Sequence, residues 1–408
     1  MNGLLIHMAW RNVWRNRRRT LITMGSIIMA VMLSSVMVSM QQGQYDQMID
    51  QTVGSFTGHA QIMNPSFRVE PSLDHSLKIT DSLVQSLTRT PEIAQIIPRI
   101  DSYALAAGPQ RTQAGMVIGI DVEAEKYLSK PDQHITAGRY FLDNSEHGVL
   151  IGSGLAQRLN VNIGDSLVLM STGYRGLTAA DLIPITGIFS FGLPDLNNQI
   201  MYIPIHTAQY FYGLDGQVSS IALLTHNSKD VSAVTTELNT HLPASLQAYD
   251  WMSLVPELVQ AIQADRGSGF IVLLVLYMVV GFGIFGTILM MTAERRYEFG
   301  VLLAIGTSRA RIAGMLVLEM VMLTFFGTLA GMLAAFPVML YFHWYPLSFS
   351  GEAAMAIEEY GMEPFIRFSI DPQLLMNQAF IVAVITLLIC LYPLLHTRKL
   401  EPVSAMRS

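Results

Sequence analysis

The chain has 408 residues, of which 51% are hydrophobic and only 14% are charged, and its formal net charge is −6. An average soluble domain carries about 25% charged residues, so the composition argues against a soluble globular protein and indicates a membrane protein. The single cysteine, Cys390, excludes an intramolecular disulfide, and no nucleic-acid partner is expected.

Four long runs of the sequence are almost free of charge, and Glu319 is their only charged residue. The runs are Thr20–Tyr45, Gly267–Ala293, Ile312–Gly351 and Pro372–Thr397. Each can supply the roughly 20 residues that cross about 30 Å of hydrocarbon. The runs predict membrane helices over 20–42, 268–292, 312–343 and 374–396. A cleaved signal peptide is the alternative for the first run, but the run is longer than a typical one and no small-x-small cleavage site follows it.

Basic residues predict the orientation of these helices. Twelve of the 25 Lys and Arg lie in residues 1–20, in residues 293–312 and in the tail after Thr397. Basic residues near membrane helices favour the cytoplasmic side. We therefore expect a cytoplasmic amphipathic elbow over 1–19, a cytoplasmic coupling segment over 293–311 and a cytoplasmic tail over 397–408. Residues 43–266 and the loop 344–373 are then outside.

Residues 43–266 have the composition of a globular domain and are numerous enough to form their own core. Alternating apolar residues predict six strands: Ile96–Ala107, Met116–Ile120, Ser166–Met170, Leu182–Phe189, Gln199–Ile203 and Ser219–Leu224. Asp81–Arg89 and Ser228–His241 are predicted helices. The order indicates an extracytoplasmic α+β domain of one or two lobes with mainly antiparallel pairing. Gln41–Thr57 and Pro243–Asp265 are expected to be helical stalks.

The segment Phe189–Asn198 joins two of the predicted strands and is rich in turn residues. Its sequence predicts a turn or a protruding hairpin. Phe191, Leu193, Pro194 and Asp195 are candidate contacts for an external partner. The alternative is a plain hairpin whose apolar residues pack on their own domain.

Motifs for catalysis or metal binding are not found. The sequence has no P-loop, no His-Glu-x-x-His and no Cys-x-x-Cys. Gly152-Ser153-Gly154 lacks the Gly-x-Ser-x-Gly frame of a serine hydrolase, and His59 and His75 fit ordinary loop or strand positions. We therefore expect no catalytic residue, metal or cofactor on this chain.

The segment after the second predicted span carries charges first and apolar residues afterwards. Glu294, Arg295, Arg296 and Glu298 alternate in sign, and Gly300, Leu302 and Gly306 follow. This order predicts a short helix over Glu294–Ile305 whose end packs beneath the helix bundle. The charges can orient a partner protein; the alternative is a solvated helix end with weak internal pairs.

Polar and small residues within the predicted spans are candidates for helix packing. An isolated charge in hydrocarbon is unfavourable by about 2.5–3.5 kcal/mol, so Glu319 should face protein, water or the interface. It is expected to be a hydrogen-bond anchor, because a proton relay would need a second carboxylate in the spans. Gly281, Gly327 and Gly331 allow close approach of helices, or else they only add flexibility.

The whole chain resembles the permease subunits of the MacB/FtsX/LolC–LolE superfamily of ABC transporters. The four-span layout and several motifs carry the resemblance. These motifs are Ala9-Trp10-Arg11-Asn12 with Arg15, Ala293-Glu294-Arg295-Arg296 with Glu298 and Gly300, Glu319 followed by Gly327 and Gly331, Tyr392-Pro393, and Glu401-Pro402-Val403. In the external domain, Gly138-Arg139, Val149-Leu150-Ile151-Gly152 and Gly164-Asp165 are similar to the family, and Gly58-His59-Ala60-Gln61-Ile62 favours its LolC/LolE branch.

The resemblance implies a non-catalytic permease of the inner membrane that works as a mechanotransmitter. Its expected partners are cytoplasmic ABC ATPase subunits that hold ATP and Mg, a second permease copy or paralogue, and a periplasmic carrier or adaptor with a lipid or lipoprotein substrate. The leading function is lipoprotein release or related lipid handling. The alternatives are a MacB-like efflux or peptide-export permease and an FtsX-like signal transmitter. The substrate and the choice between homodimer and heterodimer stay open.

Overall fold

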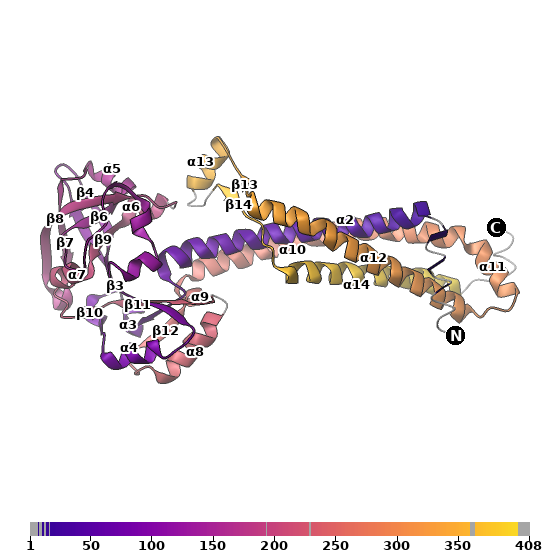
Figure 1. The fold of residues 1–408 in the computed structure, drawn as a ribbon, viewed down its shortest axis with the longest axis horizontal. Helices are drawn as coiled ribbons and strands as arrows, with labels where there is room; N and C mark the ends of the chain where they lie inside the picture. The colour runs from indigo at the N-terminus through magenta and orange to yellow at the C-terminus, as the bar shows by residue number, and fades with distance from the viewer. Residues whose placement is uncertain are drawn as a thin grey trace. The chain divides into compact units, whose positions relative to one another are not determined.

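Four long helices dominate the first of two units in the computed structural model, which describes residues 7, 10–11, 14–15, 17–192, 194–227, 230–359 and 364–398. This helical unit comprises Met1–Asp46, Ile262–Ser348 and Phe365–Ser408. Its elements are α2 (Arg17–Thr52), α10 (Pro256–Glu294), α11 (Arg296–Ala304), α12 (Arg309–Trp344), α14 (Pro372–Arg398), β13 (Leu347–Ser348) and β14 (Phe365–Ile366), as Figure 1 shows. By length and composition, α2, α10, α12 and α14 can each cross a membrane.

These helices contain the predicted spans and extend beyond most of them. Helix α2 continues to Thr52, as expected for a stalk over Gln41–Thr57, and is followed by a π-helical turn over Val53–Thr57. Apolar side chains of all four helices form one core, in which Ile27 and Val31 of α2 meet Ile288 of α10, Leu323 of α12 and Val382 of α14. Burial of this apolar surface, together with close packing, holds the bundle together.

The second unit is α+β and comprises Gln47–Ala261 and Phe349–Pro364. Its strands are β1 (Ala60–Met63), β2 (Leu77–Lys78), β3 (Ile93–Ala107), β4 (Thr112–Ile120), β5 (Ile135–Gly138), β6 (Val149–Gly152), β7 (Ser166–Thr172), β8 (Thr178–Phe189), β9 (Ile200–Pro204), β10 (Gln217–Val218), β11 (Ser220–Thr225) and β12 (Gln247–Asp250). Its α-helices are α3 (Pro65–Val69), α4 (Asp81–Thr88), α5 (Ser153–Leu159), α6 (Pro194–Gln199), α7 (Ile205–Tyr212), α8 (Val231–His241), α9 (Trp251–Leu254) and α13 (Glu352–Glu359). Short 3₁₀ turns are η2 (Leu73–His75), η3 (Ala124–Tyr127), η4 (Pro131–His134) and η5 (Tyr174–Gly176).

Ten strands form one mixed sheet in the order β12-β1-β11-β3-β4-β9-β6-β8-β5, and β7 pairs with both β3 and β8. The strands β3, β4, β9, β6, β8 and β7 therefore close into a circuit. Two pairs, β4 with β9 and β6 with β8, are parallel, and the other pairs are antiparallel. The predicted strands and helices are confirmed, and the buried apolar residues described in this unit form one large cluster and two smaller ones.

The expected second stalk over Pro243–Asp265 is wrong in its first half. Residues Gln247–Asp250 form the edge strand β12, which pairs antiparallel with β1, and the helix begins only at Pro256. The Asn239 side chain explains the difference, because it accepts from the Ala248 N–H at 2.8 Å and donates to the Ala248 carbonyl at 3.0 Å. This side chain pairs the outer edge of β12 much as a neighbouring strand would.

Candidate coupling site

The segment between α10 and α12 is an ordered helix with a well-defined end. Helix α10 ends at Glu294, Arg295 lies between the helices, and α11 covers Arg296–Ala304. After α11, the Gly306 N–H donates to the Leu303 carbonyl at 3.1 Å and the Thr307 N–H donates to the Leu302 carbonyl at 2.9 Å. Gly306 has φ +93°, so this pair of bonds is a Schellman cap at a position that favours glycine.

One side of α11 is packed on the beginning of α12. Phe299 is almost fully buried against Ile312, Met315 and Leu316, and Leu302 and Leu303 lie at the edge of the same cluster. Gly300 is also buried. Because these contacts fix α11 on α12, a displacement of α11 must also displace the first turns of α12.

The apolar residues of this segment do not all pack against the bundle. Tyr297, Val301 and Ile305 are exposed, and Ile305 is 73% exposed. They are spaced by four residues, so they form a stripe along one side of α11. Exposed apolar side chains that share a face indicate an interaction surface. The spacing of these three residues was a signal in the sequence for this apolar stripe.

A buried ion pair joins Arg295, just after α10, to the first third of α12. The Arg295 Nη1 donates to Glu319 Oε2 at 2.6 Å, and both side chains are less than 10% exposed. Glu319 is therefore anchored by a hydrogen bond, as expected, and its partner comes from the predicted docking charges. Since Arg295 is buried, it does not lie on the surface where the sequence placed it.

A second ion pair joins the N-terminal segment to α11. The Arg15 Nη2 donates to both carboxylate oxygens of Glu298, at 2.5 and 2.6 Å. This hydrogen bond raises the pKa of Arg15. Both side chains are about half exposed, and such a pair stabilises a protein by about 0–1 kcal/mol. Residues on the same segment add a ring contact between Trp10 and Phe326 of α12, with 5.7 Å between centroids.

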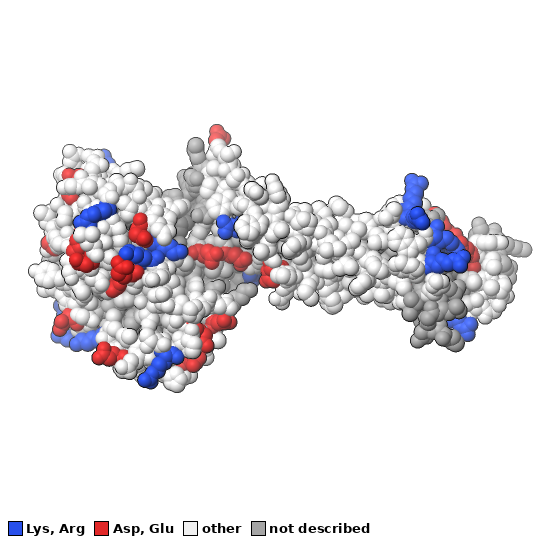
Figure 2. Space-filling model, in the orientation of Figure 1, with Lys and Arg blue, Asp and Glu red and all other residues white. Residues whose placement is uncertain are grey.

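The charges near α11 stand out on the surface of the helical unit. Figure 2 shows blue Lys and Arg side chains gathered at the end of this unit that carries α11, while the middle of the helices is white. Glu294 is exposed and has an interaction partner. The side chain of Arg296 lies outside the described part of the structure.

Two of the three predicted packing glycines bring α12 close to α2. A Cβ at Gly327 would lie 2.8 Å from the Ile27 Cγ2, and one at Gly331 would lie 2.7 Å from the Val31 Cβ. Only glycine permits this approach. Gly281 is buried too, but a Cβ there would lie 3.7 Å from Ile389, which is ordinary contact.

The predicted partner loop of the external domain is not a hairpin. Helix α6 starts at Pro194 and fills the connection from β8 to β9. Phe191 is buried with its ring centroid 4.8 Å from that of Phe189, and the Asn197 side chain binds the Phe191 N–H and carbonyl. Phe191 is therefore a core residue, as the plain-packing alternative expects. Leu193 lies outside the described residues, as do the side chains of Pro194 and Asp195.

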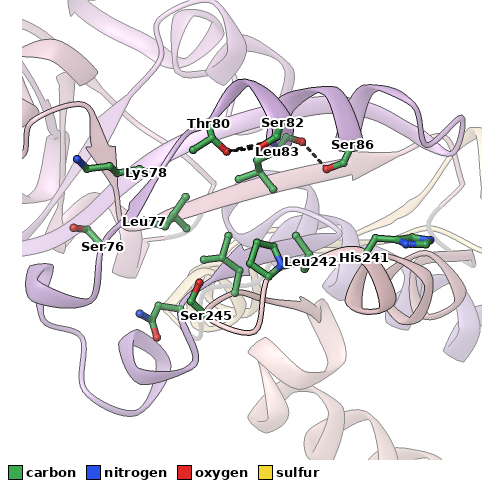
Figure 3. A pocket seen from close by; sticks show the side chains of 13 residues that line it. Ser76, Leu77, Lys78, Thr80, Ser82, Leu83, Ser86, His241, Leu242 and Ser245 are labelled. Atoms are coloured by element: carbon green, nitrogen blue, oxygen red, sulfur yellow. Dashed lines mark hydrogen bonds between the residues drawn. The ribbon is translucent and has the colours of Figure 1, made fainter.

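A pocket of about 380 Å³ lies in the α+β unit between β2, α4 and the segment after α8. Figure 3 shows Leu77, Leu83 and Leu242 with several hydroxyl groups around it. Two of these hydroxyls bond the backbone of α4: Thr80 accepts from the Leu83 N–H at the start of the helix, and Ser86 donates to the Leu83 carbonyl. Thr80 is thus the N-cap of α4.

Among the described residues, no group of three or more His, Cys, Asp or Glu side chains could hold a metal ion. His59 instead accepts from the Thr225 N–H through Nδ1 at 3.0 Å.

Two family models match the chain. Residues 20–241 match the MacB-like periplasmic core domain, and residues 270–402 match the FtsX-like permease C-terminal model. The first match covers most of α2 and the α+β unit as far as the end of α8, and the second covers the chain from within α10 through α14.

Three relatives illustrate the similarity. The lipoprotein-releasing system transmembrane protein LolC of Neisseria meningitidis serogroup B is 23% identical over 264 residues, which cover 62% of this chain and 63% of LolC. The corresponding LolE of Haemophilus influenzae is 22% identical over 71% of this chain and 69% of LolE. The pyoverdine export ATP-binding/permease protein PvdT of Pseudomonas syringae pv. tomato is 26% identical over 81% of this chain and 51% of PvdT. The chain thus spans from about half to about two thirds of the length of these relatives.

Proposed function

The chain belongs to the MacB/FtsX/LolC–LolE superfamily of ABC-transporter permeases, and from that premise we propose that it passes the motion of a separate ATPase across the inner membrane. ATP and Mg bind to that ATPase, and this chain supplies no catalytic residue. The single observation that carries the proposal is α11, an ordered helix with an exposed apolar stripe, packed on the start of a long helix.

The apolar stripe is the proposed contact for the ATPase. Tyr297 supplies an aromatic side chain of the kind that dominates binding energy at interfaces. Val301 and Ile305 extend the stripe by two turns. The Arg15–Glu298 pair lies beside it and gives orientation more than affinity.

Motion of α11 then has two described routes into the bundle. The Phe299 cluster carries it to α12, and the Arg295–Glu319 pair carries it between α10 and α12. Because Gly327 and Gly331 pack closely on α2, movement of α12 is also transmitted to α2. Because packed helices shift as bodies rather than deform, displacement at α11 is expected at the other ends of α2 and α10.

The docking proposal is tested by removing the stripe without disturbing the core. Val301→Ser with Ile305→Ser should reduce co-purification with the cognate ATPase about tenfold or more, because interface anchors each contribute at least about 1 kcal/mol. Leu142→Ser is the matched control, since Leu142 is 74% exposed in the α+β unit. Unchanged co-purification for the double variant would remove α11 as the docking site.

Lipoprotein release or related lipid handling is the preferred output. Relatives named as parts of lipoprotein-releasing systems support it. The partners proposed with it are a second permease copy or paralogue and a periplasmic carrier. In vesicles that hold the permease, its ATPase and a fluorescent lipoprotein, ATP should drive transfer of the lipoprotein to an added carrier. ATP turnover without transfer would count against this output.

Export of a small molecule is the second candidate. It rests on the similarity to PvdT over 81% of this chain. In the same vesicles it predicts ATP-dependent movement of a dye or peptide across the membrane. Transfer of lipoprotein without such movement would exclude it.

A further inference from the structure

The α+β unit receives α2 through a five-residue π-helical turn, Val53–Thr57. The Gly58 N–H donates to the Val53 carbonyl at 2.8 Å and closes the turn, and Gly58 has φ +73°. Strand β1 begins two residues later, at Ala60. A π-turn is less regular than an α-helix and is frequent at functional positions. These residues are the direct chain connection between the last turns of α2 and the sheet.

A buried arginine holds this turn. Arg99 of β3 is 1% exposed, and its guanidinium reaches in two directions. Its Nε donates to Glu125 Oε2 at 2.9 Å and its Nη2 donates to Glu125 Oε1, while its Nη1 donates to the Phe56 carbonyl inside the π-turn. Glu125, in η3, is fully buried and also accepts from the Ser129 hydroxyl.

Other contacts fix the same turn on its remaining sides. The Phe56 ring packs against the cluster that contains Phe189 and Tyr202. The Gln61 amide donates to the Thr57 carbonyl at 2.8 Å. Just after the turn, the Trp251 N–H at the start of α9 donates to the His59 carbonyl at 3.0 Å.

A buried ion pair is a poor source of stability, because apolar residues of similar volume often serve as well. Its geometry is specific, however: the planar guanidinium offers donors in a rigid fork. The Nε and Nη2 groups of Arg99 bind Glu125, and its Nη1 group binds the Phe56 carbonyl in the turn. We propose that Arg99, held by Glu125, is a positioning residue that locks the π-turn to β3. Displacement of α2 then moves the sheet and is not absorbed by the turn.

This inference rests on the proposed function for the source of the motion, but the lock itself can be tested without it. Arg99→Lys keeps a positive charge beside Glu125 and removes the fork. Arg99→Leu with Glu125→Leu removes both charges and keeps an apolar interior. Arg139→Leu with Glu146→Leu is the control, because it removes an ion pair of the same unit that has an exposed arginine.

The first readout is hydrogen exchange of the Gly58 amide, measured on the purified full-length chain in detergent. Loss of a charge-assisted bond to the turn should speed this exchange about tenfold or more in Arg99→Lys and in the double leucine variant. Exchange in the core strands, such as the Ile118 amide, should stay protected, which shows that the unit is folded. Unchanged Gly58 exchange in both variants would overturn the lock.

The second readout is the response of β1 to nucleotide in the complex with the ATPase. In the unaltered protein and the control, ATP should change the exchange of β1 amides. In the double leucine variant, ATP turnover should persist while this change is lost. If the variant keeps the response, the positioning role is wrong. If the unaltered protein binds no ATPase, the proposed function fails, while the Gly58 result still decides the lock.

Discussion

Single charges near α11 serve two distinct purposes. Arg295 and Glu319 form a buried pair, whereas Arg15 and Glu298 form an exposed one. Breaking a buried pair from one side leaves a charge without compensation, which destabilises a protein by about 3–5 kcal/mol. An exposed pair contributes about 0–1 kcal/mol, so its change should alter recognition instead of folding.

The buried pair gives the first prediction. Glu319→Leu alone should lower the unfolding free energy in detergent by about 3–5 kcal/mol, because Arg295 stays buried and loses the carboxylate that binds it. Adding Arg295→Met should restore most of that loss. Denaturant titration of the single variants and the double variant measures the effect. Equal destabilisation in the single and double variants would show that the pair is not coupled.

The exposed pair gives the second prediction. Glu298→Lys should weaken ATPase binding while leaving the folded state intact. The exchange Arg15→Glu with Glu298→Arg restores the internal pair with its charges reversed. Pull-down with the ATPase compares the two variants. Recovery of ATPase binding by the exchange would mean that the pair acts within the permease. We expect binding to stay weak, which would mean that the ATPase contacts Glu298 directly.

A histidine in the α+β unit gives the third prediction. Burial lowers the pKa of His59, whose unfolded value is about 6.5. The unfolded chain then binds the proton more readily, so stability is complete above about pH 6.5 and falls as the pH drops toward the lower folded pKa. His59→Gln should flatten this dependence of the unfolding free energy, which for one group is at most about 1.4 kcal/mol per pH unit. Unfolding titrations at several pH values measure it, and an identical slope in both proteins would contradict it.

At the scale of elements, the glycines of α12 set its distance from α2. Gly331→Val should force the helices apart and cost about 1–3 kcal/mol, as overpacking does, since even a Cβ would lie 2.7 Å from that of Val31. Gly283→Ala is the control on α10, where nothing lies within 4 Å of an added Cβ. The melting temperatures of the two variants are measured in detergent, and Gly331→Val should melt lower than Gly283→Ala. Equal melting temperatures would contradict close packing at Gly331.

Sequence patterns predicted elements well where one period or one signal dominates. Alternation along β3 and β8 located those strands, and long apolar runs located α2, α10, α12 and α14. The patterns failed where a distant side chain decides local structure. Asn239 makes β12 a strand, and Asn197 with the Phe189 cluster draws Phe191 inward.

The position of helix α11 was predicted, but the partners of its charges were not. Charges after an apolar run located α11, yet their pairing depends on Glu319 and Arg15, which are far away in the sequence. No local pattern reports such contacts. The inward packing of Phe299, and not of Val301, likewise follows from the tertiary position of α12.

At the scale of the whole molecule, orientation in the membrane follows from its basic residues and remains a prediction. In a Cys390→Ser background, Tyr210→Cys should react with an impermeant thiol reagent on cells with a permeable outer membrane, and Ser308→Cys should not. Both positions are exposed. Labelling of position 308 alone would reverse the orientation and place α11 on the side without ATP.

Direct contact between α11 and the ATPase is the central claim, and site-specific cross-linking tests it most directly. Ile305→Cys, in the Cys390→Ser background, should form a covalent adduct with an ATPase that carries cysteines in its membrane-facing groove. Cross-linking should increase or decrease when ATP is added, because the contact moves during the cycle. Leu142→Cys, which is equally exposed in the α+β unit, should give no adduct. An assembled, ATP-hydrolysing complex in which position 305 never cross-links would contradict the account.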